Sequence, residues 1–260
     1  MAMGTRLVSD YAADQAEREI AKWILIGKYR AGDKLPALPV LAEELGVSFP
    51  TLSKALGRLK TRRLVSFVPG EGVFVQSIIE CVGLDMLHAM ITYCDEGWRR
   101  WMLLCQFYDF IRPLLVDWAE RSALKGTPDH LQWITHYTLA LEDRVNRKAT
   151  REDIGTTEYE LARVLAAGGG NICCTMTINP LFDLYASDVL VKGQETIVPP
   201  EAYRAMLNAL YARDGKRAGE ILEAALWQRE LACIAELRKL GWSATGDRLE
   251  GEINDESVAG

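Results

Sequence analysis

The chain has 260 residues, of which 49% are hydrophobic and 25% are charged, a balance typical of a soluble globular protein. This length is enough for one large domain or two modest ones. The sequence has no apolar run of about eighteen residues and no long apolar core near its start, so neither a membrane span nor secretion is expected. The six cysteines include no CxxC pair, which favours reduced thiols in a cytoplasmic protein.

The net charge of −6 is distributed unevenly along the chain. Residues 1–79 contain eleven Lys or Arg against eight Asp or Glu, whereas residues 80–260 contain nineteen against twenty-eight. A basic N-terminal part joined to an acidic remainder suits a nucleic-acid-binding module attached to a body with another task. The basic excess is small, so the prediction of function depends mainly on the residue pattern.

The first helix is predicted from about Ser9 to Ile26, where apolar side chains recur along one face and Gly27 ends the helix. Two short helices follow, joined by a tight turn at Gly46, and Ser48 stands at the N-cap of the second. The inward face of this second helix is the repeat Leu52, Ala55, Leu56 and Leu59. Such a pair is typical of a helix-turn-helix, whose second helix can enter a DNA major groove. A plain helical hairpin in a core gives the same pattern.

Two short strands are predicted next, at residues 64–68 and 73–75, on either side of a turn at Pro69–Gly72. Three helices and this hairpin make a winged helix-turn-helix over residues 1–76. Beyond it a 3.6-residue period predicts helices at roughly 79–94, 97–124, 128–147, 151–167, 178–191, 199–213 and 215–240. We therefore predict a mainly α protein, with an antiparallel all-α helical bundle over residues 77–245 and a polar, disordered tail over residues 246–260.

The N-terminal motifs resemble those of the GntR family of bacterial transcription factors. The matching stretches are Gly32–Pro36, Leu41–Ser48, Thr51–Leu59 and Leu64–Val75. The helical remainder is similar to the FadR-like subfamily through Glu142, Glu158, Tyr159, Arg163, Gly170, Asn171, Tyr203, residues 213–218 and Trp227. This resemblance implies a transcriptional regulator that binds double-stranded DNA as a homodimer on a palindromic operator. It also implies that the helical domain binds a small effector.

The resemblance implies that the second short helix lies in the major groove and offers its outward face to the bases. Phe49 can pack on a thymine methyl group, Ser53 can bond base edges, and Lys54 and Arg58 are placed for phosphates, as are Lys60, Arg62 and Arg63. The predicted DNA-binding residues are Lys34, Ser48, Phe49, Thr51, Ser53, Lys54, Arg58, Gly70 and Gly72. For each basic residue, a solvated surface position remains the alternative.

The chain departs from the family at positions that usually carry arginine, which here are Pro39, Phe49, Ser53 and Glu71. A bidentate hydrogen bond from arginine to guanine contributes about 1–3 kcal/mol of discrimination per contact. Its loss predicts either a different operator, for instance an A·T-rich one, or weaker binding. Glu71 at the tip of the wing would repel phosphate. We therefore predict a sequence preference unlike that of FadR.

Many members of the FadR-like subfamily hold a divalent metal with an Asp and three His residues. This chain has three histidines in all, and the resemblance places Arg163 at a ligand position, with Tyr203 and Trp227 near the later ones. A carboxylate without imidazole partners cannot assemble a zinc or nickel site of that kind. We predict no metal and no cofactor.

Arg112 lies where the subfamily tends to carry an acid. The predicted effector-binding residues are Tyr108, Arg112, Arg163, Tyr203 and Trp227, with both arginines pointing into one cavity. Such a pocket suits an anionic, partly apolar molecule, for example an organic acid or an acyl thioester. The alternative is that both arginines pair with acids on neighbouring helices, namely Glu120, Glu158 or Glu160.

Three classes of function compete for this chain. The leading one is an effector-controlled DNA-binding regulator; a repressor is the commoner role in the family, and the sequence leaves activation open. The second is a protein-interaction module whose winged domain has lost strong DNA binding, and a weak salt dependence would identify it. The third, an enzyme, is not expected and no catalytic residue is assigned, because the sequence offers no nucleophile–base pair, metal constellation or cofactor loop.

Overall fold

The computed structural model describes residues 2–81, 83–93, 98–187 and 198–239. These residues belong to two compact units, one covering the described residues up to 93 and the other those from 98 to 239. We expected the boundary after residue 76, but residues 78–93 group with the first unit because Met86 packs into its core. The predicted tail and the end of the helix expected at 178–191 lie outside the described residues.

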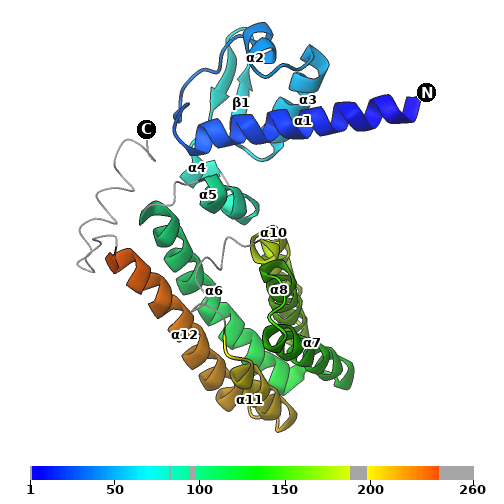
Figure 1. Ribbon diagram of the computed structural model, residues 1–260, viewed down its shortest axis with the longest axis vertical. Helices are drawn as coiled ribbons and strands as arrows, with labels where there is room; N and C mark the ends of the chain where they lie inside the picture. The colour runs from blue at the N-terminus through cyan, green and yellow to red at the C-terminus, as the bar shows by residue number, and fades with distance from the viewer. Residues whose placement is uncertain (1, 82, 94–97, 188–197, 240–260) are drawn as a thin grey trace. The chain divides into compact units, whose positions relative to one another are not determined.

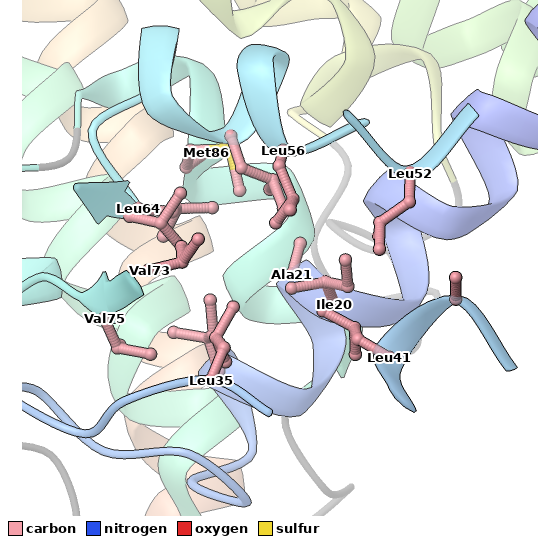
Figure 2. Packing of buried hydrophobic residues seen from close by; sticks show 14 residues of the cluster. Ile20, Ala21, Leu35, Leu41, Leu52, Leu56, Leu64, Val73, Val75 and Met86 are labelled. Atoms are coloured by element: carbon pink, nitrogen blue, oxygen red, sulfur yellow. The ribbon is translucent and has the colours of Figure 1, made fainter. Parts of the chain in front are cut away.

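The first unit is built on three helices that converge on one apolar core, which Figure 2 shows from close by. Ile20 of the first helix, Leu41 of the second and Leu52 of the third are each fully buried there. The hairpin adds Leu64 and Val73. The elements are α1 (Ala2–Leu25), α2 (Leu38–Glu44), α3 (Phe49–Thr61), β1 (Val65–Val68), β2 (Gly72–Val75), α4 (Ile78–Cys81) and α5 (Leu87–Tyr93).

The hairpin is antiparallel, with Val65 opposite Val75 and Val68 opposite Gly72. Its burial alternates along β2, where Val73 and Val75 face the core. The connector before α2 joins the hairpin through an isolated bridge between Lys34 and Phe74. Three helices and a wing in this order confirm the predicted winged helix-turn-helix.

The described part of the second unit is entirely helical (Figure 1). Its elements are α6 (Trp98–Lys125), α7 (Pro128–Asn146), α8 (Arg151–Gly168), α9 (Ile172–Ile178), α10 (Phe182–Ala186), α11 (Pro200–Tyr211) and α12 (Gly215–Lys239). The continuous helix expected from residue 178 is wrong at its start, because a 3-10 turn over Asn179–Leu181 stands there instead. The predicted helix ranges do not include α9, which begins directly after its N-cap Asn171. None of the described helices is both long and apolar enough to span a bilayer.

The two longest helices of this unit, α6 and α12, pack side by side and run antiparallel (Figure 1). Their close approach depends on glycine, because a Cβ atom on Gly215 would stand 2.9 Å from the backbone oxygen of Glu120. A Cβ atom on Gly219 would stand 2.5 Å from the carboxylate of the same residue. Farther along the pair, the guanidinium of Arg112 lies 5.1 Å from the ring centre of Trp227.

Candidate nucleic-acid interface and interior polar site

Helix α3 begins with a side-chain cap. Ser48 has extended backbone angles, and its hydroxyl accepts a hydrogen bond from the backbone N–H of Thr51 at 3.4 Å. The two hydroxyl oxygens of these residues lie 2.8 Å apart and share a second hydrogen bond. The cap satisfies one of the free N–H groups at the helix start, as the sequence predicted. Both hydroxyls are therefore already engaged within the protein.

The two faces of α3 differ sharply in exposure. Leu52, Ala55, Leu56 and Leu59 are fully buried. On the opposite side Ser53 and Lys54 are exposed, and 54% of Phe49 is open to solvent. A large aromatic ring held outward at the start of a helix offers an apolar surface that the protein itself does not cover.

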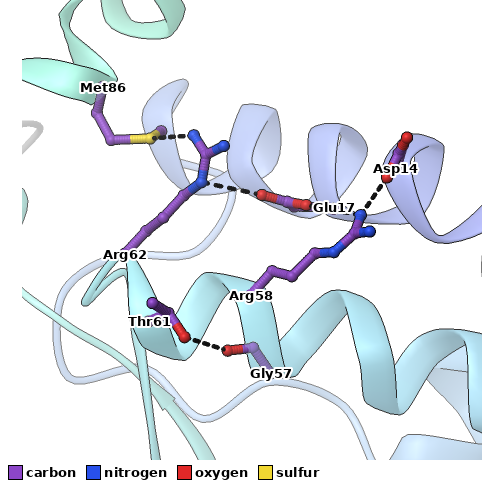
Figure 3. A network of polar contacts seen from close by, with 7 residues as sticks. All are labelled: Asp14, Glu17, Gly57, Arg58, Thr61, Arg62 and Met86. Carbon is purple, nitrogen blue, oxygen red and sulfur yellow. Dashed lines mark hydrogen bonds and ion pairs between the residues drawn. The ribbon is translucent and has the colours of Figure 1, made fainter. Parts of the chain in front are cut away.

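The arginines near the end of α3 turn toward α1 (Figure 3). Arg58 forms an ion pair with Asp14 and a second one, at 3.4 Å, with Glu17. Arg62 contacts Glu17 at 3.1 Å and donates to the sulfur of Met86 at 3.2 Å. The hydrogen bond that Arg58 donates to Asp14 is the main cause of the raised pKa of Arg58. Arg58, which we expected at a phosphate, is thus held by two acids of α1.

The wing brings two of the predicted residues together. The side chain of Lys34 lies against Gly72, where a Cβ atom would stand 2.9 Å from its Cε. Gly72 has φ +135° and Gly70 has φ +77°, so both use backbone conformations that favour glycine. Glu71 stands exposed between them. The wing therefore exposes Glu71 at its turn, and the aliphatic part of the Lys34 side chain lies against β2 at Gly72.

The helical unit contains a buried ion pair between Glu158 of α8 and Arg229 of α12, whose side chains are only 7% and 5% exposed. The hydroxyl of Tyr203 donates to Glu158 at 3.3 Å, and the guanidinium of Arg229 lies 5.6 Å from the ring centre of Tyr108. Tyr185 is buried beside them. We call these five residues the polar core.

Burial is the main cause of the raised pKa of Tyr108, Tyr185 and Tyr203, so all three phenols are neutral at physiological pH. The Nε of Arg229 has no hydrogen-bond partner among the described residues. Arg229 lines a small cavity of about 20 Å³, which has room for roughly one water molecule. Glu158, Tyr185 and Tyr203 of the polar core also line this cavity, and its remaining lining side chains are apolar: Leu115, Leu161, Ala162, Leu165, Leu222 and Leu226.

Arg112 and Trp227 lie together in a different place, an open hollow that Glu220, Glu223 and Ala224 also line. Arg112 contacts three carboxylates, Glu230 at 3.0 Å, Glu223 at 3.3 Å and Asp109 at 3.5 Å. Acids therefore outnumber the arginine, and this hollow is a poor site for an anion.

The five predicted effector-binding residues are thus divided among three places. Tyr108 and Tyr203 belong to the polar core, and Arg112 shares the open hollow with Trp227. Arg163 bonds Glu160 twice, at 2.8 and 2.7 Å, with 40% of its side chain exposed. Glu160 is one of the acids that the sequence offered as an alternative partner, but it lies three positions before Arg163 on the same helix and not on a neighbouring one.

The sequence analysis missed Arg229, although a signal for it exists. It lies at position i+7 of a stripe that is otherwise apolar: Leu222, Leu226, Cys233 and Leu237. A charged residue inside such a stripe has to find a partner in the interior. Glu158, which was noted as a family position and as a possible partner of Arg112 or Arg163, occupies the matching place on α8 beside Leu161. In the part of the chain that the structure describes, no three His, Cys, Asp or Glu residues come together to hold a metal ion.

Comparison with known proteins gives consistent matches. Residues 12–75 match the family model of bacterial regulatory proteins, gntR family. A fatty acid metabolism regulator protein of Shewanella sp. (strain ANA-3) is 28% identical over 196 residues, covering 75% of this chain and 76% of the relative. The protein of the same name from Edwardsiella ictaluri is 26% identical over 206 residues, covering 78% and 79%. The solved structure of Lar, described as controlling the Listeria monocytogenes agr system, has a TM-score of 0.62 at 15% identity and covers 86% and 96%, which shows a shared fold.

Proposed function

We propose that this chain, a transcriptional regulator of the GntR family and not an enzyme, binds its operator under the control of a small acidic or acyl effector. The observation that carries the proposal is the polar core, a charged and hydroxyl-bearing site in the interior of the helical unit, beside a cavity lined also by leucines. A buried ion pair contributes little net stability compared with apolar packing, so its presence favours a role in binding.

The DNA-binding part of the proposal rests on α3 and the wing. The exposed Phe49 and Ser53 supply base contacts, and Lys54 and Lys34 supply phosphate contacts. The apolar start of α3 favours thymine, whose methyl group lies in the major groove. Two copies of the chain on a palindromic site would present two such α3 helices about one turn of the DNA double helix apart.

Selection of duplexes from a random DNA library by the full chain tests this part. We expect a palindromic consensus with thymines at the positions that Phe49 contacts. Phe49→Ala should relax the preference there and leave the salt dependence unchanged, whereas Lys54→Ala should weaken binding to all sequences and lower the salt slope by about one. Recovery of a FadR-type operator would contradict the predicted preference.

The effector part rests on the charge balance of the two pockets. Arg112 is outnumbered by acids, whereas Arg229 faces one carboxylate and keeps an Nε that has no partner among the described residues. The leucines around the cavity suit an acyl chain, in keeping with the curated relatives named fatty acid metabolism regulators. Because the closed cavity holds about one water molecule, an effector has to separate α8 from α12, and this movement can shift the population toward a form with a different DNA affinity.

A series of saturated acyl-coenzyme A thioesters and their free acids provides the probes for this effector. We expect some chain length to change the affinity of the full chain for its selected duplex. Tyr203→Phe removes only a hydroxyl and should weaken that response by about tenfold, the loss of one hydrogen bond to a charged group. Arg112→Gln, the matched control, should leave the response unchanged. Equal effects of both variants would place the effector elsewhere.

The alternative of a protein-interaction module is not favoured, because residues 12–75 match the family model and the α3 face is open. The missing arginines and the acidic wing predict a changed operator under the leading proposal. A DNA affinity that stays constant between low and moderate salt would restore the alternative.

A further inference from the structure

Two cysteine thiols meet between the long helices of the second unit. Cys105 lies on α6 and Cys233 on α12, two helices that pack against each other, and the neighbouring Cys105 thiol helps to raise the pKa of the Cys233 thiol. Cys233 is fully buried, whereas Cys105 is half-buried. Neither thiol has a part in the proposed DNA or effector binding.

The contacts between α6 and α12 show which residues of the two helices lie opposite each other. Near one end Gly219 meets Glu120, and farther along Trp227 meets Arg112. Residue numbers fall along α6 as they rise along α12, as antiparallel packing requires. Between the two helices the Arg229 guanidinium lies 5.6 Å from the Tyr108 ring centre, and one turn beyond this contact, on the same sides of the two helices, stand Cys105 and Cys233. The thiol contact therefore follows from the helix packing as a whole.

We propose that Cys105 and Cys233 form a reversible disulfide when the protein meets a peroxide. Two thiols already in contact across closely packed helices need little backbone movement to reach disulfide geometry. Cys105 is the more exposed of the two and is oxidised first. Cys233 is fully buried, so peroxide does not reach it first, and it is the resolving partner.

The chemistry balances with hydrogen peroxide as the oxidant. The Cys105 thiol releases its proton to solvent and the thiolate attacks one peroxide oxygen, so that the O–O bond breaks and a sulfenic acid and hydroxide form; the hydroxide takes up the released proton and becomes water. The Cys233 sulfur then attacks the Cys105 sulfur, the S–O bond breaks, and a second water leaves. Two thiols lose two hydrogens, and one peroxide is reduced to two waters.

The bridge would act one helical turn from the polar core, since Tyr108 follows Cys105 by three positions and Arg229 precedes Cys233 by four. It fastens α12 to α6 at this point. The bridged form therefore resists any displacement of α12, including one that would open the cavity.

Peptide mapping of the reduced full chain after mild peroxide treatment in native buffer tests the proposal. After alkylation and tryptic digestion we expect residues 101–121 to be joined to residues 230–238, two hydrogens lighter than the separate peptides. Dithiothreitol should separate them. The oxidised chain should also melt roughly 5 °C or more above the reduced chain, because the bridge closes a long loop.

Matched variants keep the proposal falsifiable. Cys105→Ala and Cys233→Ala should each abolish both the joined peptide and the rise in melting temperature, whereas Cys173→Ala should abolish neither. Retention of native helical content, measured by circular dichroism, establishes that each variant is folded. Alkylation of both thiols after treatment, or a bridge from Cys105 to any other cysteine, would overturn the proposal.

Discussion

Replacement of Glu158 with alanine should lower the free energy of unfolding of the helical unit by about 3–5 kcal/mol. The change leaves the guanidinium of Arg229, which is only 5% exposed, without its carboxylate in a low-dielectric interior. The hydroxyl of Tyr203 loses its acceptor as well. A loss of about 4 kcal/mol reduces the folding equilibrium constant roughly a thousandfold, a large part of the stability of a typical domain.

Urea denaturation followed by far-ultraviolet circular dichroism measures this loss. With a slope of roughly 2 kcal/mol per molar, the midpoint should fall by about 2 M. The double variant Glu158→Leu with Arg229→Met should recover most of the loss, because apolar residues of similar volume often replace a buried pair without a large penalty.

The matched surface control is Glu160→Ala, which breaks the exposed pair with Arg163. It should cost less than about 1 kcal/mol, because solvent screens the charges. A Glu158→Ala variant no less stable than Glu160→Ala would refute the reasoning. So would a double variant that unfolds as readily as the single one.

Three further predictions concern pH, packing and capping. In the folded protein the three tyrosines of the polar core have pKa values above the ordinary value of about 10. The stability that depends on their protonated form is therefore complete below pH ~10. Above that pH the free energy of unfolding falls by up to about 1.4 kcal/mol per pH unit for each phenol. Urea midpoints across this range, with phenolate absorbance appearing only on unfolding, check the direction. Gly155→Ala should destabilise by about 1–3 kcal/mol, because its Cβ would stand 1.8 Å from the backbone oxygen of Tyr185; Gly57→Ala, in open space within a helix, should stabilise by about 0.5–1 kcal/mol. Ser48→Ala should cost about 1 kcal/mol in thermal or urea unfolding, through the lost α3 cap.

Each of these predictions has a contradicting result. A urea midpoint unchanged between about pH 9 and 11 would show that the phenols are not buried in solution. Equal losses for both glycine variants would remove the steric argument. A Ser48→Ala protein as stable as the parent would mean that water replaces the cap at no cost.

The sequence predicted the parts of the fold that depend on neighbouring residues. The α2–α3 turn, the Ser48 cap and the two wing strands follow from apolar period, turn glycines and capping chemistry within a few positions. The break at Pro180 was also open to prediction, since proline lacks the N–H that a continuous helix needs.

The interior pairings were harder to predict, because their partners lie far apart in the sequence. Arg229 meets Glu158 across two helices, and Arg58 meets Asp14 across the first unit. Apolar period says which face of a helix is buried, but it does not say which residue of another helix lies opposite. This is why Arg112 and Arg163, assigned to one cavity, occupy separate places.

The glycines of α12 at positions 215 and 219 have a consequence for motion. A Cβ atom at Gly215 would crowd the backbone oxygen of Glu120, so the two helices are in close contact at that end and a tilt of α12 would pivot there. From Gly219 to Cys233 the axis measures about 21 Å, so a tilt of only about 5° would carry the far end by roughly 2 Å. A small rotation of α12 about the glycine contact would therefore separate it from α6 most at the far end, where Cys233 and Arg229 lie.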